Sequence, residues 1–379
     1  MPFLHGIGWI LVGLAGIGIL YTLVAASLLG RLFRPFSSGP AKAEAVSLLK
    51  PLYGAEPRLA ANLATFLDQD WDVPVQMVAG VQRQDDPAIA IVAGMDRREI
   101  DLIVDSTRHG ANAKVANLLN MAPAARHDLI VLSDSDMAVP PNYLATLATA
   151  LAAPGVGAAT CLYRGRGDGG AWSVIAAAGI SYQFIPQLAI GLGIGLARPG
   201  MGSTIALRRA TLDAIGGFRR FADSLADDYE LCAAVRGLGL SVVVPPILLV
   251  HGCAERSLGD VWRHELRWAA TIRTIDRGGY AGTILTHPLP LALLALPFAP
   301  ATGAGMAVAA LAARLLFKIR FDAIAGAASA PSWMLPVRDI LSFVVFVASF
   351  LVRSVDWRGE RLKMEQHGRI VRPSEMPVR

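Results

Sequence analysis

Two aspartates stand one residue apart in the stretch LIVLSDSDMAVPP, which runs from Leu129 to Pro141. Side chains alternate between the two faces of a strand, so Asp134 and Asp136 would point the same way if the strand continues through them. Two neighbouring carboxylates repel each other unless a cation or a proton lies between them. The pair therefore predicts a divalent-metal site at the mouth of a sheet. A solvated loop with helix-capping acids and serines would contain the same residues.

Two further polar clusters precede this pair. The stretch VQRQDDPA places Asp85 and Asp86 just after a predicted strand. The stretch HGANAKVANLL carries Asn112, Lys114 and Asn117. A lone pair of acids or a lone lysine indicates little, but separate clusters that each follow a strand or open a helix favour a shared polar site.

A second pair of acids lies downstream in LADDYELCAAVRGLGL. Asp227 and Asp228 open a predicted helix, whose N-terminal dipole favours negative charge, and capping alone would explain them. Alternatively, one of them is a general base, which requires an accessible carboxylate within hydrogen-bonding reach of an acceptor hydroxyl.

An amphipathic run, WRHELRWAATIRT, follows and carries His264, Arg267 and Trp268. Arginine and tryptophan are common anchors at membrane interfaces. A guanidinium is also well shaped to bind a diphosphate through two hydrogen bonds. The run is therefore either an interfacial anchor or part of a phosphate site.

Short apolar runs alternate with helical patterns before these motifs. Strands are expected at 46–52, 74–82, 99–106 and 128–136. Helices are expected at 58–70, near 85–95, at 111–121 and at 142–152. This order predicts an α/β fold with a doubly wound, mostly parallel sheet, in which ligands bind at the carboxyl ends of the strands. Neither GxGxxG after the first strand nor a P-loop sequence occurs, which argues against dinucleotide binding and P-loop ATPase activity.

The composition is that of a membrane protein, because 54% of the residues are hydrophobic and only 17% are charged. The uncharged segment Ile7–Leu29 is long enough to cross a bilayer as a helix. The residues before it contain no Lys or Arg, so a retained anchor is favoured over a cleaved signal peptide. Arg31, Arg34 and Lys42 follow it, and the positive-inside rule places the next segment in the cytoplasm.

A second apolar zone extends without charge from Gly278 to Ala313, and PFAPATGAG within it predicts a turn between two helices. Ile340–Val352 is a third candidate span, although it is short. Much of the net charge of +5 flanks apolar segments or lies in the tail, which favours anionic membrane lipids rather than nucleic acid as partners. The cysteines form no metal pattern and indicate buried thiols in a reducing compartment: Cys161, Cys232 and Cys253.

No charged residue stands between Gly170 and Arg198. Taken alone, this segment could be a transmembrane helix, which would separate Asp134 from Asp228 by a membrane. If the two acids share one site, the segment must lie in the interface or line a pocket, and a lipid acceptor would suit such a wall. An ordinary pair of core helices is the other interpretation.

Taken in order, DDPA, SDSD, ADDY and HELRW resemble the D, D, D, (Q/R)xxRW signature of membrane-bound inverting glycosyltransferases with the GT-A fold. SLLKPLYG, NAKVANL and DDYELCAAVRGLG are similar to the ceramide glucosyltransferase branch. CLYRGR, GSTIALRRATLDAIGGF, HELRWAATIRTI and GYAGTILTHPLPLALL are more similar to the bacterial hopanoid-biosynthesis-associated glycosyltransferase. The resemblance extends from about Ala45 to Gly359. It departs at His264, where the signature has Gln or Arg, although Arg263 is adjacent.

The resemblance implies a role for each matching residue. Asp86 would lie near the uridine of a UDP-sugar donor, and Asp134 and Asp136 would hold Mg²⁺ or Mn²⁺ against the diphosphate, because hard oxygen ligands suit either ion. Asp228 would be the catalytic base. The other implied donor-binding residues are Lys114, Asn117, Arg267 and Trp268. Further candidates for contact with donor or acceptor are Asp85, Asn112, Asp227, Arg263 and His264.

The hopanoid branch implies transfer of N-acetylglucosamine from UDP-N-acetylglucosamine to bacteriohopanetetrol at the bacterial inner membrane. The alternatives are ceramide glucosylation from UDP-glucose and a non-catalytic protein that binds nucleotide sugar or lipid. The implied organisation is an anchor (1–34), a cytoplasmic GT-A domain (43–276) with an interfacial or acceptor-pocket segment (171–199), C-terminal membrane helices (279–353) and a basic tail (354–379).

Overall fold

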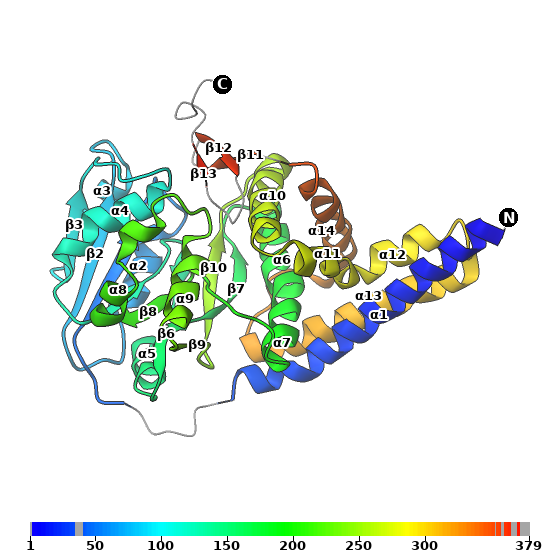
Figure 1. The fold of residues 1–379 in the computed structure, drawn as a ribbon, viewed down its shortest axis with the longest axis horizontal. Coiled ribbons are helices and arrows are strands. Elements are labelled where there is room, and N and C mark those ends of the chain that lie inside the picture. The colour runs from blue at the N-terminus through cyan, green and yellow to red at the C-terminus, as the bar shows by residue number, and fades with distance from the viewer. Residues whose placement is uncertain (1, 35–40, 353, 358–359, 365–369, 372–379) are drawn as a thin grey trace. The chain divides into compact units, whose positions relative to one another are not determined.

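The computed structural model describes residues 2–34, 41–352, 354–357, 360–364 and 370–371 (Figure 1). Its contacts divide the chain into two compact units. The first, here called the sheet unit, comprises Phe33–Tyr163, Arg198–Ala254 and Gly368–Arg379. The second, here called the helical unit, comprises Met1–Leu32, Arg164–Ala197 and Glu255–His367. Of the expected basic tail, residues 358–359, 365–369 and 372–379 lie outside the described residues.

The sheet unit is built on a seven-stranded sheet of order β3-β2-β1-β4-β8-β6-β9. Its strands are β1 (Val46–Pro51), β2 (Val75–Val81), β3 (Ile100–Val104), β4 (Leu129–Leu132), β6 (Val156–Thr160), β8 (Ile205–Arg208) and β9 (Ser241–Val243). The first four are mutually parallel, β8 is antiparallel to β4 and to β6, and β6 is parallel to β9. The predicted α/β fold with a mostly parallel sheet is confirmed.

Helices connect these strands as the alternating pattern predicted. They are α2 (Leu59–Leu67), α3 (Ala88–Ala93), α4 (Ala113–Met121), η1 (Ala122–Ala124), α5 (Tyr143–Leu151), α8 (Arg209–Ala214), η3 (Phe218–Phe221) and α9 (Asp227–Gly237). A buried apolar cluster joins Leu49, Val78 and Ile130 of the sheet to Leu118 of α4 and Leu231 of α9. Because α4 and α9 pack on this core, their first turns are held near the carboxyl ends of β1 and β4.

The strand that precedes the first acid pair is shorter than expected. β4 ends at Leu132, and Asp134 and Asp136 lie in the turn between β4 and the two-residue strand β5 (Met137–Ala138). β5 pairs with β10 (Leu248–Cys253), in which Val250 faces Ala138. The Asp134 N–H donates to the carbonyl of Gly202 at 3.3 Å instead of continuing the ladder. The expectation that strand alternation aligns the two acids was therefore wrong, because backbone contacts of the turn place them.

The helical unit contains the apolar segments. Its helices are α1 (Pro2–Leu32), α6 (Ala171–Gly179), the π-helix η2 (Ile180–Phe184), α7 (Ile185–Gly193), α10 (Leu258–Ile275), α11 (Arg277–Gly282), η4 (Thr283–Thr286), α12 (Pro288–Ala295), α13 (Pro300–Ala325), η5 (Ser332–Met334) and α14 (Leu335–Ser349). The remaining strands of the chain are β7 (Leu162–Gly167), β11 (Ser354–Trp357), β12 (Glu360–Met364) and β13 (Ile370–Val371). Figure 1 shows α1, α12 and α13 side by side.

Four helical segments among the described residues are long and apolar enough to cross a membrane: His5–Leu32, Ala171–Gly193, Pro300–Ala325 and Ser332–Ser349. The first contains the predicted anchor, and the last overlaps the third predicted span. The predicted helical hairpin is present as α12 and α13, but its second arm continues to Ala325. That arm carries Arg314 and Lys318, which are buried and ion-paired, so a charge-free pattern could not reveal its full length.

Candidate functional site

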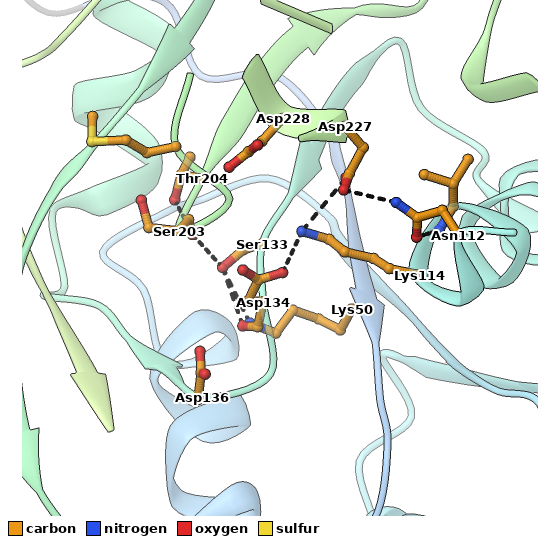
Figure 2. Close-up of polar contacts among 12 residues, drawn as sticks. Lys50, Asn112, Lys114, Ser133, Asp134, Asp136, Ser203, Thr204, Asp227 and Asp228 are labelled. Atoms are coloured by element: carbon orange, nitrogen blue, oxygen red, sulfur yellow. Dashed lines mark hydrogen bonds and ion pairs between the residues drawn. The ribbon is translucent and has the colours of Figure 1, made fainter. Parts of the chain in front are cut away.

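Acids from two segments of the sheet unit converge on one lysine (Figure 2). Lys114, in the first turn of α4, has its Nζ 2.6 Å from Oδ1 of Asp134 and 3.8 Å from Oδ2 of Asp227. Burial disfavours the charged form of Lys114, but the charges of Asp134, Asp227 and Asp228 outweigh that effect and raise the pKa of Lys114. The predicted residues Lys114, Asp134, Asp227 and Asp228 therefore form one cluster.

Asn112 fixes the geometry of this cluster from one side. It caps α4, since its Oδ1 accepts from the Val115 N–H at 3.0 Å. Its Nδ2 donates to the Ser224 carbonyl at 2.7 Å and to Oδ1 of Asp227 at 3.0 Å. Asn112 is fully buried. It therefore positions α4 and Asp227 relative to each other.

Asp228 has the environment of a general base. It lies half-buried in the first turn of α9, and its Oδ1 accepts from the Tyr229 N–H at 2.8 Å. Burial, and then the charge of neighbouring Asp227, raise the pKa of Asp228 to about 6, while Lys114 opposes the shift. A carboxylate with a pKa near 6 is ionised at neutral pH and is a stronger base than an ordinary aspartate.

Lys50 is a part of the site that the sequence reasoning missed. It is fully buried on β1, donates from Nζ to the main-chain carbonyl of Asp134 at 2.5 Å and lies 3.6 Å above the centre of the Phe66 ring. Burial lowers the pKa of Lys50 to about 7, although Asp134 and Asp136 oppose the shift. The available signal was a single lysine within the apolar strand VSLLKP.

Asp136 contacts a second residue that was missed, His251 of β10. Its Oδ2 lies 3.2 Å from Nε2 of His251. Burial lowers the pKa of His251, but the Asp136 carboxylate outweighs it and raises that pKa well above its usual value. Beside them, the Tyr163 ring lies 5.6 Å from the imidazole ring, and Cys253 Sγ lies 3.6 Å from Nδ1. A histidine in the strand LLVHGC was the only sequence signal.

A glycine, Gly202, lets three charged side chains approach the main chain closely. A Cβ atom at Gly202 would lie 2.8 Å from Oδ2 of Asp134, 3.1 Å from Nζ of Lys114 and 3.3 Å from Oδ2 of Asp228. At Gly200 a Cβ would instead lie 2.7 Å from the main-chain oxygen of Asp228. Three charged side chains therefore meet beside Gly202, at a position where a Cβ would press against them.

The residues present fit a divalent cation. In the described part of the chain, no group of three or more His, Cys, Asp or Glu side chains is arranged to hold a metal ion. However, Asp134 and Asp136 supply hard oxygen ligands, and a cationic ammonium already lies against Asp134. The other oxygen of the same carboxylate, Oδ2, lies beside Gly202. This donor set suits Mg²⁺ or Mn²⁺.

The other predicted site residues of the sheet unit mainly make contacts that stabilise the fold. The buried Asp86 accepts from the Gly54 N–H at 3.0 Å and from the Ala88 N–H at 2.9 Å, which ties the loop after β1 to α3. Asp85 is exposed and pairs with Arg83 at 2.5 Å. Asn117 donates to the Gly80 carbonyl at 2.7 Å and so holds α4 on β2.

The HELRW motif lies on α10 of the helical unit, whereas the acids belong to the sheet unit. His264 Nδ1 lies 2.5 Å from Oε1 of the buried Glu255, and its ring packs edge-on against Trp268 with centroids 4.4 Å apart. Arg263 is exposed and pairs with Asp260 at 2.5 Å. Arg267 lies on the same helix. The histidine that replaces the usual Gln or Arg is therefore held by a carboxylate.

Comparison with known proteins gives the fold and the family. In the mannosyltransferase PcManGT from Pyrobaculum calidifontis, solved with GDP-Man and Mn²⁺, the backbone matches with a TM-score of 0.53 at 18% identity and covers 92% of this chain and 98% of that one. This likeness shows the GT-A-like fold. Ceramide glucosyltransferase 1 of Caenorhabditis elegans is 25% identical over 232 residues, which are 59% of this chain and 48% of the relative. The chain thus matches about half the length of that relative.

The family model for glycosyl transferase family 21 matches residues 10–370. This range includes both the acid cluster of the sheet unit and the motif helix of the helical unit. The chain therefore belongs to glycosyl transferase family 21.

Proposed function

We propose that this chain is an inverting, metal-dependent glycosyltransferase that transfers N-acetylglucosamine from UDP-N-acetylglucosamine to a hydroxyl of a hopanoid lipid, bacteriohopanetetrol. The observation that carries the transfer reaction is the convergence of Asp134, Lys114 and Asp228 beside Gly202. A metal ligand, a cation for the diphosphate and a base are the groups that sugar transfer from a nucleotide requires.

In the proposed reaction, the Asp228 carboxylate takes the proton of the acceptor hydroxyl. The acceptor oxygen forms a bond to the anomeric carbon as the bond from that carbon to the diphosphate oxygen breaks, and UDP leaves. A single displacement inverts the anomeric configuration, so no carboxylate nucleophile is needed. The raised pKa of Asp228 suits this role, because its conjugate acid holds the proton more firmly than an ordinary aspartic acid would.

Roles for the donor-binding residues are also part of the proposal. A divalent cation held by Asp134 and Asp136 would neutralise charge on the diphosphate. Lys114 would contact the diphosphate. Asp86 would lie near the uridine, while its carboxylate accepts from the Gly54 and Ala88 N–H groups. From α10, Arg267 and Trp268 would bind the departing nucleotide and shape the acceptor entrance.

The membrane setting is also part of the proposal. β6 and β8 are neighbours in one sheet, with Ala158 opposite Leu207, so both ends of the intervening chain lie on the same side of a membrane. Extended backbone cannot return through hydrocarbon, because its polar groups would lack partners. We therefore infer that Ala171–Gly193 lies in the interface or re-enters it, despite being long enough to span. Such a segment would form a wall for a lipid acceptor.

The localisation that follows is the bacterial inner membrane, with 1–34 as an anchor, 279–353 as membrane helices and the sheet unit in the cytoplasm. Arg31 and Arg34 after the first apolar helix support this orientation. UDP-sugars, the proposed donors, would then reach the acid cluster from the cytoplasmic side.

Ceramide glucosylation from UDP-glucose is the second candidate, favoured by the match to ceramide glucosyltransferase 1. It would use the same acids and a different lipid. A non-catalytic protein that binds nucleotide sugar or lipid is the third, and the presence of Asp134, Asp136 and Asp228 argues against it.

A donor-by-acceptor assay on the detergent-purified full chain separates these candidates. UDP-N-acetylglucosamine and UDP-glucose are each offered with bacteriohopanetetrol and with ceramide, with Mg²⁺, with Mn²⁺ or with chelator, and products are identified by mass spectrometry. We expect an N-acetylglucosaminyl hopanoid that disappears with chelator. Glucosylceramide would overturn the substrates and keep the reaction class. No transfer in any combination, from protein that still binds UDP, would favour the non-catalytic candidate.

A further inference from the structure

One oxygen of Asp134, a proposed metal ligand, is already paired with a cation of the chain itself. Lys114 Nζ is 2.6 Å from Oδ1 of Asp134, and only 10% of the Lys114 side chain is exposed. Asp134 is the more accessible partner, with 36% of its side chain exposed. A pair this close and this shielded from water interacts more strongly than a surface ion pair. A divalent ion that binds Asp134 would therefore share this carboxylate with Lys114 and be repelled by its charge.

A second acceptor for the lysine lies within a short movement. Oδ2 of Asp227 is 3.8 Å from Lys114 Nζ, so a shift of about 1 Å would bring the ammonium to hydrogen-bonding distance. Asn112 holds the other oxygen of Asp227 at 3.0 Å, which keeps this carboxylate in place. Figure 2 shows the Lys114 ammonium between the two carboxylates. The lysine can thus leave Asp134 without losing an ionic partner.

We propose that Lys114 is an exchangeable counter-cation: it neutralises Asp134 in the metal-free protein and moves towards Asp227 when a divalent ion binds. The inference rests on the metal-binding role proposed for Asp134. It has two consequences. The pre-existing ion pair weakens the binding of metal alone, and the displaced ammonium becomes available to a diphosphate. Metal and nucleotide would therefore bind more tightly together than either does separately.

The direct test is Mn²⁺ binding without nucleotide, measured by isothermal titration calorimetry on the detergent-purified full chain. Lys114→Met removes the competitor, so we expect it to bind Mn²⁺ about tenfold more tightly than the wild-type protein. Lys114→Arg keeps a cation and should bind Mn²⁺ about as the wild type does. Lys114→Gln replaces the methionine variant if that protein does not fold.

A matched control separates competition from a general change in charge. Arg236 lies on α9 and donates to the carbonyl of Pro199, and neither of these groups belongs to the acid cluster. Arg236→Met removes one positive charge, as Lys114→Met does, without releasing Asp134. We expect its Mn²⁺ affinity to stay within about twofold of wild type.

Thermal unfolding supplies a readout independent of catalysis. Without metal, Lys114→Met should melt at a lower temperature than wild type, because Asp134 and Asp227 lose their shared counter-charge. The gain in melting temperature on adding Mn²⁺ should be larger in the variant, since a ligand that binds only the folded state stabilises it by an amount that grows with the logarithm of its affinity. Tighter Mn²⁺ binding together with this larger gain would show that Lys114 competes with the ion, as the exchange requires.

Two results would overturn the inference, and they differ in what else they overturn. If Lys114→Met binds Mn²⁺ no more tightly than wild type, while Asp134→Asn abolishes binding, the exchange is wrong and the proposed metal site stands. If Asp134→Asn binds Mn²⁺ as well as wild type does, the metal site itself is wrong, and the exchange fails with it.

Discussion

Charged side chains are balanced differently in the two units of this protein. In the helical unit, buried acids and bases pair one to one: Arg314 with Asp339, Lys318 with Asp322, and Arg338 with Glu265. In the sheet unit, Asp134, Asp136, Asp227 and Asp228 cluster around Lys50, Lys114 and His251, and the bonds from Lys50 go to a hydroxyl and a main-chain carbonyl. The first arrangement satisfies each charge, and the second leaves negative charge for a cation or a proton to neutralise.

Two ion pairs of the helical unit connect different helices. Arg314 Nε lies 3.0 Å from both carboxylate oxygens of Asp339, and the same guanidinium contacts the carbonyl of Tyr182 in the π-helix. Arg338 on α14 bonds both oxygens of Glu265 within the HELRW motif and packs where Gly179 has no side chain. These pairs fasten helices together. The unbalanced cluster, in contrast, has the composition of a reaction site.

The largest effect should come from removing Asp228, the proposed base of the unbalanced cluster. We expect Asp228→Asn to lower the turnover of the full chain by about a hundredfold to ten-thousandfold, as loss of a general base does. Its melting temperature should not fall, because the substitution removes a charge that burial disfavours. Single-turnover kinetics and thermal unfolding of one preparation check both statements. Activity near the wild-type level would exclude Asp228 as the base.

Adding a methyl group at Gly202, beside which the charged side chains meet, should have the next largest effect. Gly202→Ala places a Cβ against the ends of three flexible side chains, which can move, so the protein should fold but lose about a hundredfold in activity. Gly200→Ala meets the main chain of Asp228 and Tyr229 and should reduce folded yield instead. Expression yield and activity of the two variants, compared side by side, measure the difference. Full activity in Gly202→Ala would show that catalysis does not need the close approach of these three side chains to Gly202.

The balanced pairs should respond in the opposite way, through stability and not through chemistry. Arg314→Met leaves Asp339 buried without its partner and should cost about 3 kcal/mol of stability. The double variant Arg314→Met with Asp339→Leu should recover most of that loss, because it removes both charges. The melting temperatures of the wild type, the single variant and the double variant are compared in one detergent. Arg320→Met, at an exposed position of α13, is the control. A double variant no more stable than the single one would show that the charges themselves are needed.

The smallest expected effect concerns the dependence of kcat/KM on pH. Burial and the charge of Asp227 raise the pKa of Asp228 to about 6, so the base is protonated below that pH. We expect kcat/KM to be half-maximal at a pH of about 6, to fall tenfold for each unit below it and to be flat above it. Asp227→Asn removes the neighbouring charge and should move the midpoint to lower pH. A midpoint unchanged by that substitution would argue that another group controls the acid limb.

Much of the fold could be predicted from local patterns alone. The strands β1 to β4 and the helices between them follow from the spacing of apolar residues, because a strand or helix is decided by neighbours in the chain. The first apolar helix follows in the same way from an uncharged run. In the candidate site, the acids were visible in the sequence because two carboxylates so close together are unusual in an apolar chain.

Only the tertiary structure decided which residues surround those acids. Lys50 looks like an ordinary strand residue, and His251 stands more than a hundred positions after Asp136, yet each contacts the turn that carries the acid pair. Gly202 is one of 37 glycines, and its importance comes from three segments that meet beside it. Sequence patterns report a residue's neighbours along the chain, whereas electrostatic and steric roles depend on neighbours in space. The sequence by itself therefore determined the chemical groups and the elements that carry them, and folding decided their partners.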